Sequence, residues 1–289
     1  MLNPIAVERS PLRFVVLTTV GALPDAMWAA WSWYRFLQAR HVELQFAVDG
    51  TLEEAEECAI RELFPSVTIF GLQPLLPPLY GRSPALDSFL LQYPLGRKLG
   101  LVLSLSQQQS FFYCDHDVLA FDFPFELLKH AEGDLPCYME EEREGNYDLG
   151  IAALCKRMGL DRLPRFNSGL LYIPHNSLSI DLAAQLIENW QLPPASWFKE
   201  QTILSVLMQQ AKAQPLPRDR YVVSNRRQFY FEEDVDYSAI AARHFTGTVR
   251  HVMYGTGMPE ILRQARFSNG TDSDNEHATT WTTCDKMRP

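Results

Sequence analysis

Apolar runs and amphipathic stretches alternate along the first half of the chain. Residues 14–19 form a short apolar run typical of a buried strand, and residues 42–48 alternate as a second strand that stops at Asp49-Gly50. A third short strand is predicted over residues 67–70. Between the first two strands, helical spacing after Pro24 predicts one apolar helix face, made of Met27, Ala30, Trp31, Tyr34 and Leu37.

The helix between the second and third strands is predicted to begin at a capping box formed by Thr51 and Glu54. Its inward face would then consist of Leu52, Ala55, Ala59 and Leu63. A proline-bearing loop follows the third strand and extends to Pro84. Periodicity next predicts a helix over residues 95–107, which leads directly into an apolar strand over residues 110–114.

The second half repeats these patterns less regularly. Residues 170–173 form another buried strand, and amphipathic helices are predicted over residues 178–190 and 197–210. Residues 268–289 are polar and without an apolar face, so we predict a flexible tail after a single domain spanning residues 1–267. Such alternation predicts an α/β fold with a mostly parallel central sheet and helices on both faces.

In sheets of this kind, ligands bind beyond the carboxyl ends of the strands. Thr18, Thr19 and Asp49 lie at two such ends, and Asp115 and Asp117 lie at another. Asp49 has a second interpretation, because Asp-Gly is common turn chemistry and we favour the turn. The pattern therefore predicts a crevice with a polar rim at this edge of the sheet.

The overall charge and composition limit the classes of function. The formal net charge is −9, which argues against a protein that coats nucleic acid with a basic face. Five widely spaced cysteines without a CxxC pair indicate neither a disulfide framework nor a thiolate zinc site. No run approaches the about 20 apolar residues that a transmembrane helix needs, and no secretory signal is evident. We expect a cytoplasmic protein.

The strongest chemical signal is the Asp-x-Asp pair at Asp115 and Asp117. Its carboxylates directly follow an apolar strand, and the chain then returns to the core through residues 118–121. Two like charges held this close repel each other unless a cation compensates them. Carboxylate oxygens are hard ligands suited to Mn²⁺ or Mg²⁺. The segment therefore indicates a divalent cation held against the phosphates of a nucleotide.

This segment resembles the Asp-x-Asp motif of GT-A-fold glycosyltransferases. Three further segments resemble the glycogenin-like and lipopolysaccharide galactosyltransferase-like retaining enzymes of that class, in order and approximate spacing. These are the Phe-Asn-Ser-Gly segment at residues 166–169, the pair Glu200-Gln201, and the His-x-x-Gly-x-x-Arg segment at residues 244–250. Glu stands at 200 where that family more often has Asp, and Arg stands at 250 where it has Lys.

The resemblance implies a role for each matching residue. Asp115, Asp117 and His244 would bind Mn²⁺ or Mg²⁺. Arg250 would act in catalysis beside the departing diphosphate, with Glu200 and Gln201 as the other predicted catalytic residues. Gly247 would let the backbone approach the phosphates. Lys98, with Arg97 as its competitor, and the strand-end residues Thr18 and Thr19 would contact the donor. The sugar pocket would be lined by Asn167, Ser168, Gly169, Glu200 and Gln201.

The implied activity is metal-dependent transfer of a sugar from a nucleoside diphosphate donor to the hydroxyl of a saccharide or other acceptor. The donor is expected to be a uridine diphosphate sugar. The resemblance also implies that the anomeric configuration is retained. One alternative is a catalytically silent protein that binds nucleotide sugars. The other is a sugar nucleotidyltransferase, which the segment Thr18-Thr19-Val20-Gly21-Ala22 disfavours, because it lacks the glycine-rich loop with basic residues that such enzymes have after the first strand.

Overall fold

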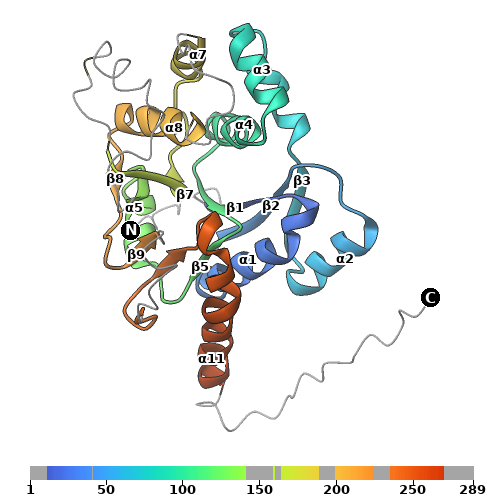
Figure 1. Cartoon of the computed structure of the whole chain (residues 1–289), viewed down its shortest axis with the longest axis vertical. Helices are drawn as coiled ribbons and strands as arrows, with labels where there is room; N and C mark the ends of the chain where they lie inside the picture. Colours follow the sequence, from blue (N-terminus) through green and yellow to red (C-terminus); the bar gives the residue numbers. More distant parts are fainter. Residues whose placement is uncertain are drawn as a thin grey trace, which may run out of the picture.

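The computed structural model describes residues 12–40, 42–140, 159, 164–188, 199–223 and 235–269. Its centre is a seven-stranded sheet in the order β3-β2-β1-β4-β7-β6-β8 (Figure 1). The strands are β3 (Thr68–Gly71), β2 (Val42–Val48), β1 (Leu12–Thr18), β4 (Phe111–Asp115), β7 (Phe166–Ile173), β6 (Cys137–Glu140) and β8 (Gln214–Pro215).

The central sheet is mostly parallel, as predicted. Strands β3, β2, β1 and β4 run parallel to one another, and β8 runs parallel to β6, whereas β7 pairs antiparallel with both β4 and β6. The carboxyl ends of β1, β2 and β4 therefore meet at one edge. This edge carries Thr18, Asp49 and Asp115.

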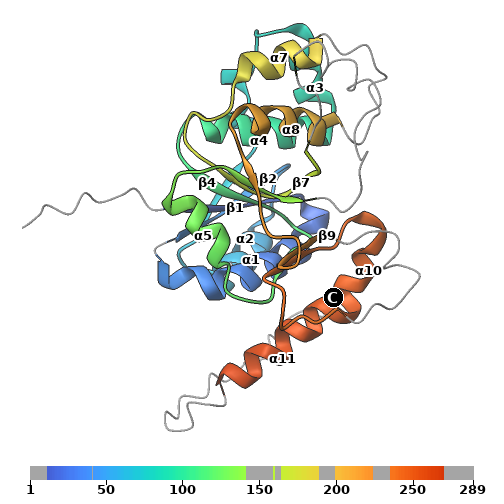
Figure 2. The same ribbon diagram turned by 90° about the vertical axis from the view of Figure 1, so that its left-hand side faces the viewer.

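One face of the sheet is covered by α3 (Pro84–Gln92), α4 (Pro94–Ser106), α7 (Ile180–Glu188) and α8 (Lys199–Gln210), which form the upper layer of Figure 2. The helices predicted over residues 95–107, 178–190 and 197–210 are thus present within the described residues. Helix α3 was not predicted, because Pro84 was assigned to a loop. Ser83 caps it, accepting from the Leu86 N–H at 3.1 Å, and proline suits the first helical turn.

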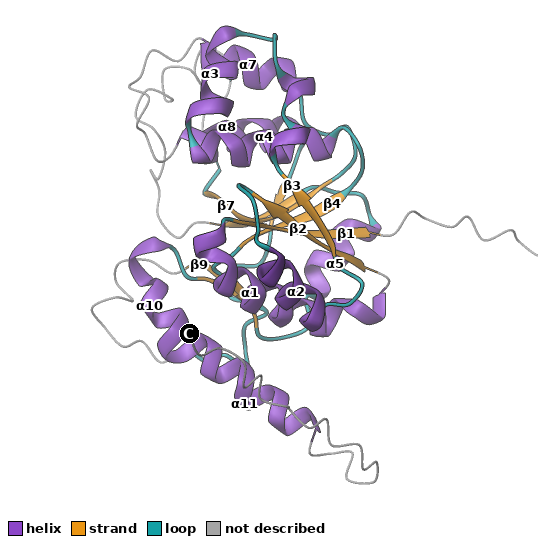
Figure 3. Cartoon of the chain, turned by 90° about the vertical axis from the view of Figure 1, so that its right-hand side faces the viewer, coloured by secondary structure: helices purple, strands orange, loops and turns teal. Residues whose placement is uncertain are grey.

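The opposite face is covered by α1 (Leu23–Leu37), α2 (Glu54–Leu63) and α5 (Phe125–Glu132), on the other side of the sheet in Figure 3. The predicted inward face of α1 was rotated from the true one. The fully buried apolar residues are Ala26, Ala29, Ala30, Trp33 and Leu37, while Met27, Trp31 and Tyr34 are only partly buried.

The prediction for α2 was wrong in its start and in its inward face. The capping box is formed by Glu53 and Glu56, two residues later than expected. The buried residue of the helix is Ile60, followed by Phe64 at its end, whereas Ala55, Ala59 and Leu63 are exposed. Several acidic residues lie at the start of this segment, so more than one pair satisfies the spacing of a capping box.

A three-stranded sheet in the order β5-β10-β9 lies beside the carboxyl end of β4. It consists of β5 (Val118–Ala120), β10 (Ala242–His244) and β9 (Tyr221–Val223). The chain then continues through α10 (Arg250–Val252), the π-helical turn η6 (Met253–Gly257) and α11 (Met258–Asn269). Short 3₁₀ turns complete the elements: η1 (Val20–Ala22), η2 (Gln38–Arg40), η3 (Gln73–Leu75), η4 (Pro77–Leu79) and η5 (Gly247–Val249).

Helix α11 includes the first two residues of the predicted tail, and residues 270–289 lie outside the described residues. Among the helices that the structure describes, none has both the length and the apolar character that a membrane crossing requires.

Candidate metal and donor site

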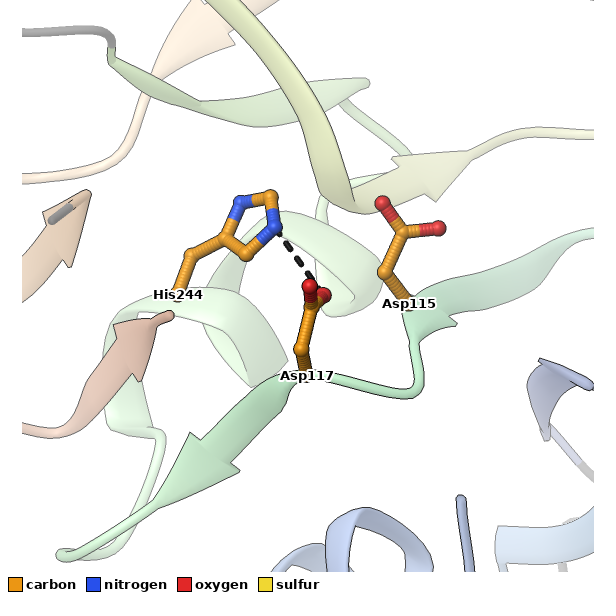
Figure 4. A group of neighbouring side chains, drawn as sticks. All are labelled: Asp115, Asp117 and His244. Carbon is orange, nitrogen blue, oxygen red and sulfur yellow. Dashed lines mark ion pairs between the residues drawn. The ribbon is translucent and has the colours of Figure 1, made fainter. Parts of the chain in front are cut away.

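The turn between β4 and β5 presents the Asp-x-Asp carboxylates. Asp115 is the last residue of β4, and Asp117 immediately precedes β5. Strand β10 pairs antiparallel with β5 so that His244 lies opposite Val118. One ligand atom each from Asp115, Asp117 and His244 lies within 4.8 Å of the other two, and Figure 4 shows the three side chains converging. The three residues predicted as metal ligands are therefore brought together.

Asp117 is held by two cationic side chains. Its Oδ1 lies 3.1 Å from Nε2 of His244, and its Oδ2 accepts from Arg250 at 2.7 Å. Burial alone raises the pKa of Asp117, but His244 and Arg250 outweigh this effect and keep its pKa well below the usual value. Burial likewise lowers the pKa of His244, while the Asp117 carboxylate reverses the shift and raises it. His244 and Arg250 thus both stabilise the ionised form of Asp117.

The other nitrogen of His244 is fixed by β7. Nδ1 lies 2.8 Å from Oδ1 of Asn167, and this oxygen also accepts from the Gly169 N–H at 2.9 Å. An amide oxygen only accepts, so Nδ1 carries a proton and Nε2 is the atom available to a cation. Two carboxylates and one imidazole form a donor set that suits Mn²⁺ and accommodates Mg²⁺. The residues therefore fit the metal that the sequence pattern indicates.

Gly169 allows the histidine ring to lie against β7. A Cβ at this position would lie 2.4 Å from Nδ1 of His244 and 2.5 Å from its Cε1. No side chain is accommodated at such distances without displacing the ring. Gly169 therefore provides the space that the His244 ring occupies.

Asp115 is held from the helical layer by Lys98 of α4. The Lys98 Nζ lies 2.9 Å from Oδ2 of Asp115, 3.0 Å from Oγ of Ser168 and 3.6 Å from Oε1 of Glu200. All of these side chains except Asp115 are buried. Ser168 also donates to Oε2 of Glu200 at 3.3 Å. Successive residues of a strand face opposite sides of the sheet. Asn167 therefore forms a hydrogen bond with His244 on one side, and Ser168 forms one with Lys98 on the other.

Glu200 is the most perturbed carboxyl group of this cluster. Burial chiefly raises its pKa to about 7, Asp115 adds to the effect, and Lys98 opposes it. Its Oε1 has no hydrogen-bond partner among the described residues. Gln201, the next residue of α8, is partly buried.

Arg97, the alternative to Lys98 as the basic residue that contacts the donor, forms an ion pair with Asp49. Its Nε donates to both carboxylate oxygens of Asp49, at 2.7 and 2.9 Å. Thr18 is buried at the end of β1, and its carbonyl accepts from the Asp49 N–H at 2.8 Å, whereas Thr19 is exposed. The carboxyl ends of β1 and β2 thus form a second polar region beside the metal site.

Three contributing residues were missed by sequence reasoning. Tyr113 donates its hydroxyl to Oδ1 of Asp115. It lies two residues earlier on β4 and hence on the same face, a spacing from which its role could have been inferred. The Tyr254 hydroxyl, in η6, donates to both oxygens of Asp25 in α1, at 2.8 and 3.0 Å. These two residues are far apart in the sequence, and no local pattern connects them.

Arg250 and Gly247 lie on the segment that follows β10. Arg250 begins α10, is partly exposed and reaches Asp117. Gly247 begins η5, and a Cβ there would meet nothing within 4 Å. Gly247 is exposed, so the backbone is accessible at this position.

Solved glycosyltransferase structures share this fold. A structure of the galactosyltransferase LgtC in complex with donor and acceptor sugar analogues matches with a TM-score of 0.58 and 14% identity, covering 89% of this chain and 96% of that one. Mouse xyloside xylosyltransferase 1 matches with a TM-score of 0.57 and 13% identity, covering 82% and 98%. The bifunctional WbbM matches with a TM-score of 0.54 and 13% identity, covering 85% and 47%.

No protein-family model matches the sequence, and the search of curated proteins also found no match. At identities of 13–14%, the likeness to these structures shows the fold but not the activity. The chain therefore has the GT-A glycosyltransferase fold, which confirms the distant resemblance inferred from its four sequence segments.

Proposed function

We propose that this chain is a metal-dependent glycosyltransferase that moves a sugar from a nucleoside diphosphate donor to a hydroxyl acceptor. The observation that carries the proposal is the convergence of Asp115, Asp117 and His244 at the strand edge where such folds bind nucleotides. The donor is expected to be a uridine diphosphate sugar, with Thr18 and Thr19 near the nucleoside. The resemblance to retaining enzymes carries the expectation of retention.

The three ligands would hold Mn²⁺ or Mg²⁺. Such a cation, when bound, neutralises negative charge on the diphosphate as the glycosidic bond breaks. Arg250 would stabilise the same charge, because its guanidinium contacts Asp117, is partly exposed and is permanently charged. The open position of Gly247 is consistent with a close approach of the backbone to the phosphates.

The cluster formed by Lys98, Ser168 and Glu200 would position the donor sugar. The buried Oε1 of Glu200 lacks a hydrogen-bond donor among the described residues, and a sugar hydroxyl would supply one. Gln201 would add an amide at the start of the same helix, and Asn167 would keep His244 in place. A pKa of about 7 suits a carboxyl that accepts a hydrogen bond without carrying a full charge near neutrality.

The transfer itself would proceed by attack from the leaving-group side. The acceptor oxygen forms the new bond to the anomeric carbon, and the bond from that carbon to the diphosphate breaks with its electron pair remaining on the diphosphate. The acceptor proton then passes to the departing diphosphate oxygen. This scheme requires no covalent enzyme intermediate and leaves the protein to position the groups and stabilise the charge.

The test is slow hydrolysis of uridine diphosphate sugars by the purified full chain. We expect uridine diphosphate release that depends on Mn²⁺ and falls by roughly 100-fold in Asp117→Asn, which keeps the shape of the side chain but not its charge. Asp181→Asn is the matched control, because Asp181 lies in an exposed ion pair with Arg82. Its activity should equal that of the wild-type protein.

A thermal-shift experiment distinguishes the silent alternative. Stabilisation by a nucleotide sugar that requires Mn²⁺, without hydrolysis or transfer to any acceptor, would support a protein that only binds. Absence of any metal-dependent stabilisation at millimolar ligand would contradict both functions, because a ligand at 100 times its dissociation constant stabilises by about 2.7 kcal/mol.

A further inference from the structure

An apolar groove lies outside the metal and donor site. It has a volume of about 480 Å³ and lies between α1, the end of α2 and α11. Its lining consists of Pro24, Met27, Trp28, Trp31, Leu63 and Leu262. Leu63 and Leu262 are 37% and 43% exposed, respectively, although both are large apolar residues. The cavity lies within the size range of sites that hold a drug-sized ligand or a large side chain.

The walls of the groove are held in place by the fold. Arg35 of α1 donates to Oε1 of Gln264 in α11 at 2.8 Å, so a hydrogen bond joins two of the helices that line the groove. The rings of Trp28 and Trp31 meet edge to face, with centroids 6.2 Å apart. The guanidinium of Arg35 lies 5.8 Å from the Trp31 ring. These contacts fix the shape of the groove, and its apolar residues Leu63 and Leu262 are exposed among the described residues.

The chain itself supplies an occupant. Residues 270–289 follow α11 directly, and Leu262 of α11 forms one wall of the groove. These residues are almost entirely polar and contain a single aromatic residue, Trp281. An isolated tryptophan in a polar segment is the type of side chain that anchors a peptide in an apolar groove.

Charge and reach are both consistent with this occupant. Asp272, Asp274 and Glu276 follow α11, while Arg266 is exposed in its last turn, four residues after Leu262 and thus on the same side of the helix. Trp281 lies 12 residues beyond Asn269. An extended chain of that length reaches about 40 Å, whereas Leu262 lies only about 10 Å back along α11 from its end.

We propose that the C-terminal segment folds back along α11 and inserts the indole of Trp281 into the apolar groove between α1, α2 and α11. The acidic residues before Trp281 would then lie beside Arg266. Because the segment is tethered to one wall, the interaction benefits from an effective concentration in the millimolar range. This proposal is independent of the glycosyltransferase function.

The test compares Trp281→Ala with Met287→Ala in the full chain. Met287 is the other large apolar residue of the segment and serves as the matched control. We expect Trp281→Ala to increase the binding of a fluorescent apolar dye several-fold and to lower the melting temperature by about 4 °C. Met287→Ala should change neither quantity.

A double-mutant cycle then locates the binding partner of Trp281. Leu262→Ala should lower the melting temperature in the wild-type background and have a smaller effect when Trp281 is already absent. Additive effects would overturn the proposal, as would a Trp281→Ala protein indistinguishable from Met287→Ala. Concentration-dependent dimerisation that Leu262→Ala abolishes would also overturn it, since a second copy would then cover the groove.

Discussion

At the residue scale, each candidate metal ligand is oriented by a side chain that lies behind it. Asn167 holds His244, Lys98 and Tyr113 hold Asp115, and Arg250 holds Asp117. Such supporting contacts fix the direction of the ligand atoms and tune their basicity. Lys98 and Arg250 also offset the charges of the two carboxylates.

The space left by Gly169 gives a sharp test of this arrangement. We expect Gly169→Ala to lower the affinity for Mn²⁺ by roughly 10- to 100-fold, because the added Cβ would displace the ring of His244. The free energy of unfolding should fall by about 1–3 kcal/mol from overpacking. Calorimetric titration with Mn²⁺ and urea unfolding measure the two effects.

Gly255→Ala is the control for this prediction, since a Cβ at Gly255 would meet nothing within 4 Å. It should leave the Mn²⁺ affinity unchanged. Unaltered metal affinity in Gly169→Ala would mean that His244 does not bind the metal.

At the scale of elements, the sequence predicted the long strands and most helices, because their periodicity extends over several residues. The strands of the small sheet have only three residues each, too few for any periodicity to appear. Sequence pattern alone therefore could not bring His244 to Asp117, and the prediction rested on family resemblance. The inward face of α1 was also predicted wrongly. This helix packs on the sheet and on the elements around β5 and α11, so apolar residues occur on more than one of its faces.

The contact between α1 and η6 is an example of what local patterns cannot predict. Tyr254 lies one turn after Arg250, and its bond to Asp25 fixes the segment that carries the guanidinium. We expect Tyr254→Phe to lower kcat/KM for the donor several-fold while the Mn²⁺ affinity stays constant, because the metal ligands are not moved. Steady-state kinetics with the donor varied at saturating Mn²⁺ would measure this.

Tyr34→Phe is the matched control, because Tyr34 is a partly buried tyrosine of α1 outside the donor site. Both variants should unfold within about 1 kcal/mol of the wild-type protein, since Tyr254 is half exposed. Equal kinetics for Tyr254→Phe and the wild-type protein would exclude a positioning role for the bond to Asp25.

At the scale of the whole molecule, an acidic protein of net charge −9 places several of its cations around the candidate metal and donor site. Lys98, Arg97 and Arg250 all bind carboxylates there. The paired carboxylates of Asp49, Asp115 and Asp117 cancel these cations, so a divalent cation would have to balance an anionic diphosphate there. The negative net charge of the whole molecule would repel a polyanion. Burial makes the ionised form of Glu200 unfavourable in the folded protein. The free energy of unfolding of the whole molecule should therefore depend on pH.

The pH dependence of unfolding follows from the raised pKa of Glu200. Its carboxyl group titrates near 4.5 in the unfolded chain and at about 7 in the folded protein. Below pH 4.5 the group is neutral in both states. Between these values the unfolded chain ionises while the folded protein retains the proton, so the free energy of unfolding falls as the pH rises, by roughly 3 kcal/mol in total.

Glu200→Gln removes this titration. Urea unfolding in EDTA at pH 4.5, 6 and 8 should therefore show the variant gaining stability relative to the wild-type protein by roughly 3 kcal/mol across the range. Glu54→Gln, a change of an exposed carboxyl on α2, should give a difference from the wild-type protein that is independent of pH. If the curves of Glu200→Gln and the wild-type protein run parallel, the pKa of Glu200 is the same in the folded and unfolded states, and Lys98 then offsets the effect of burial.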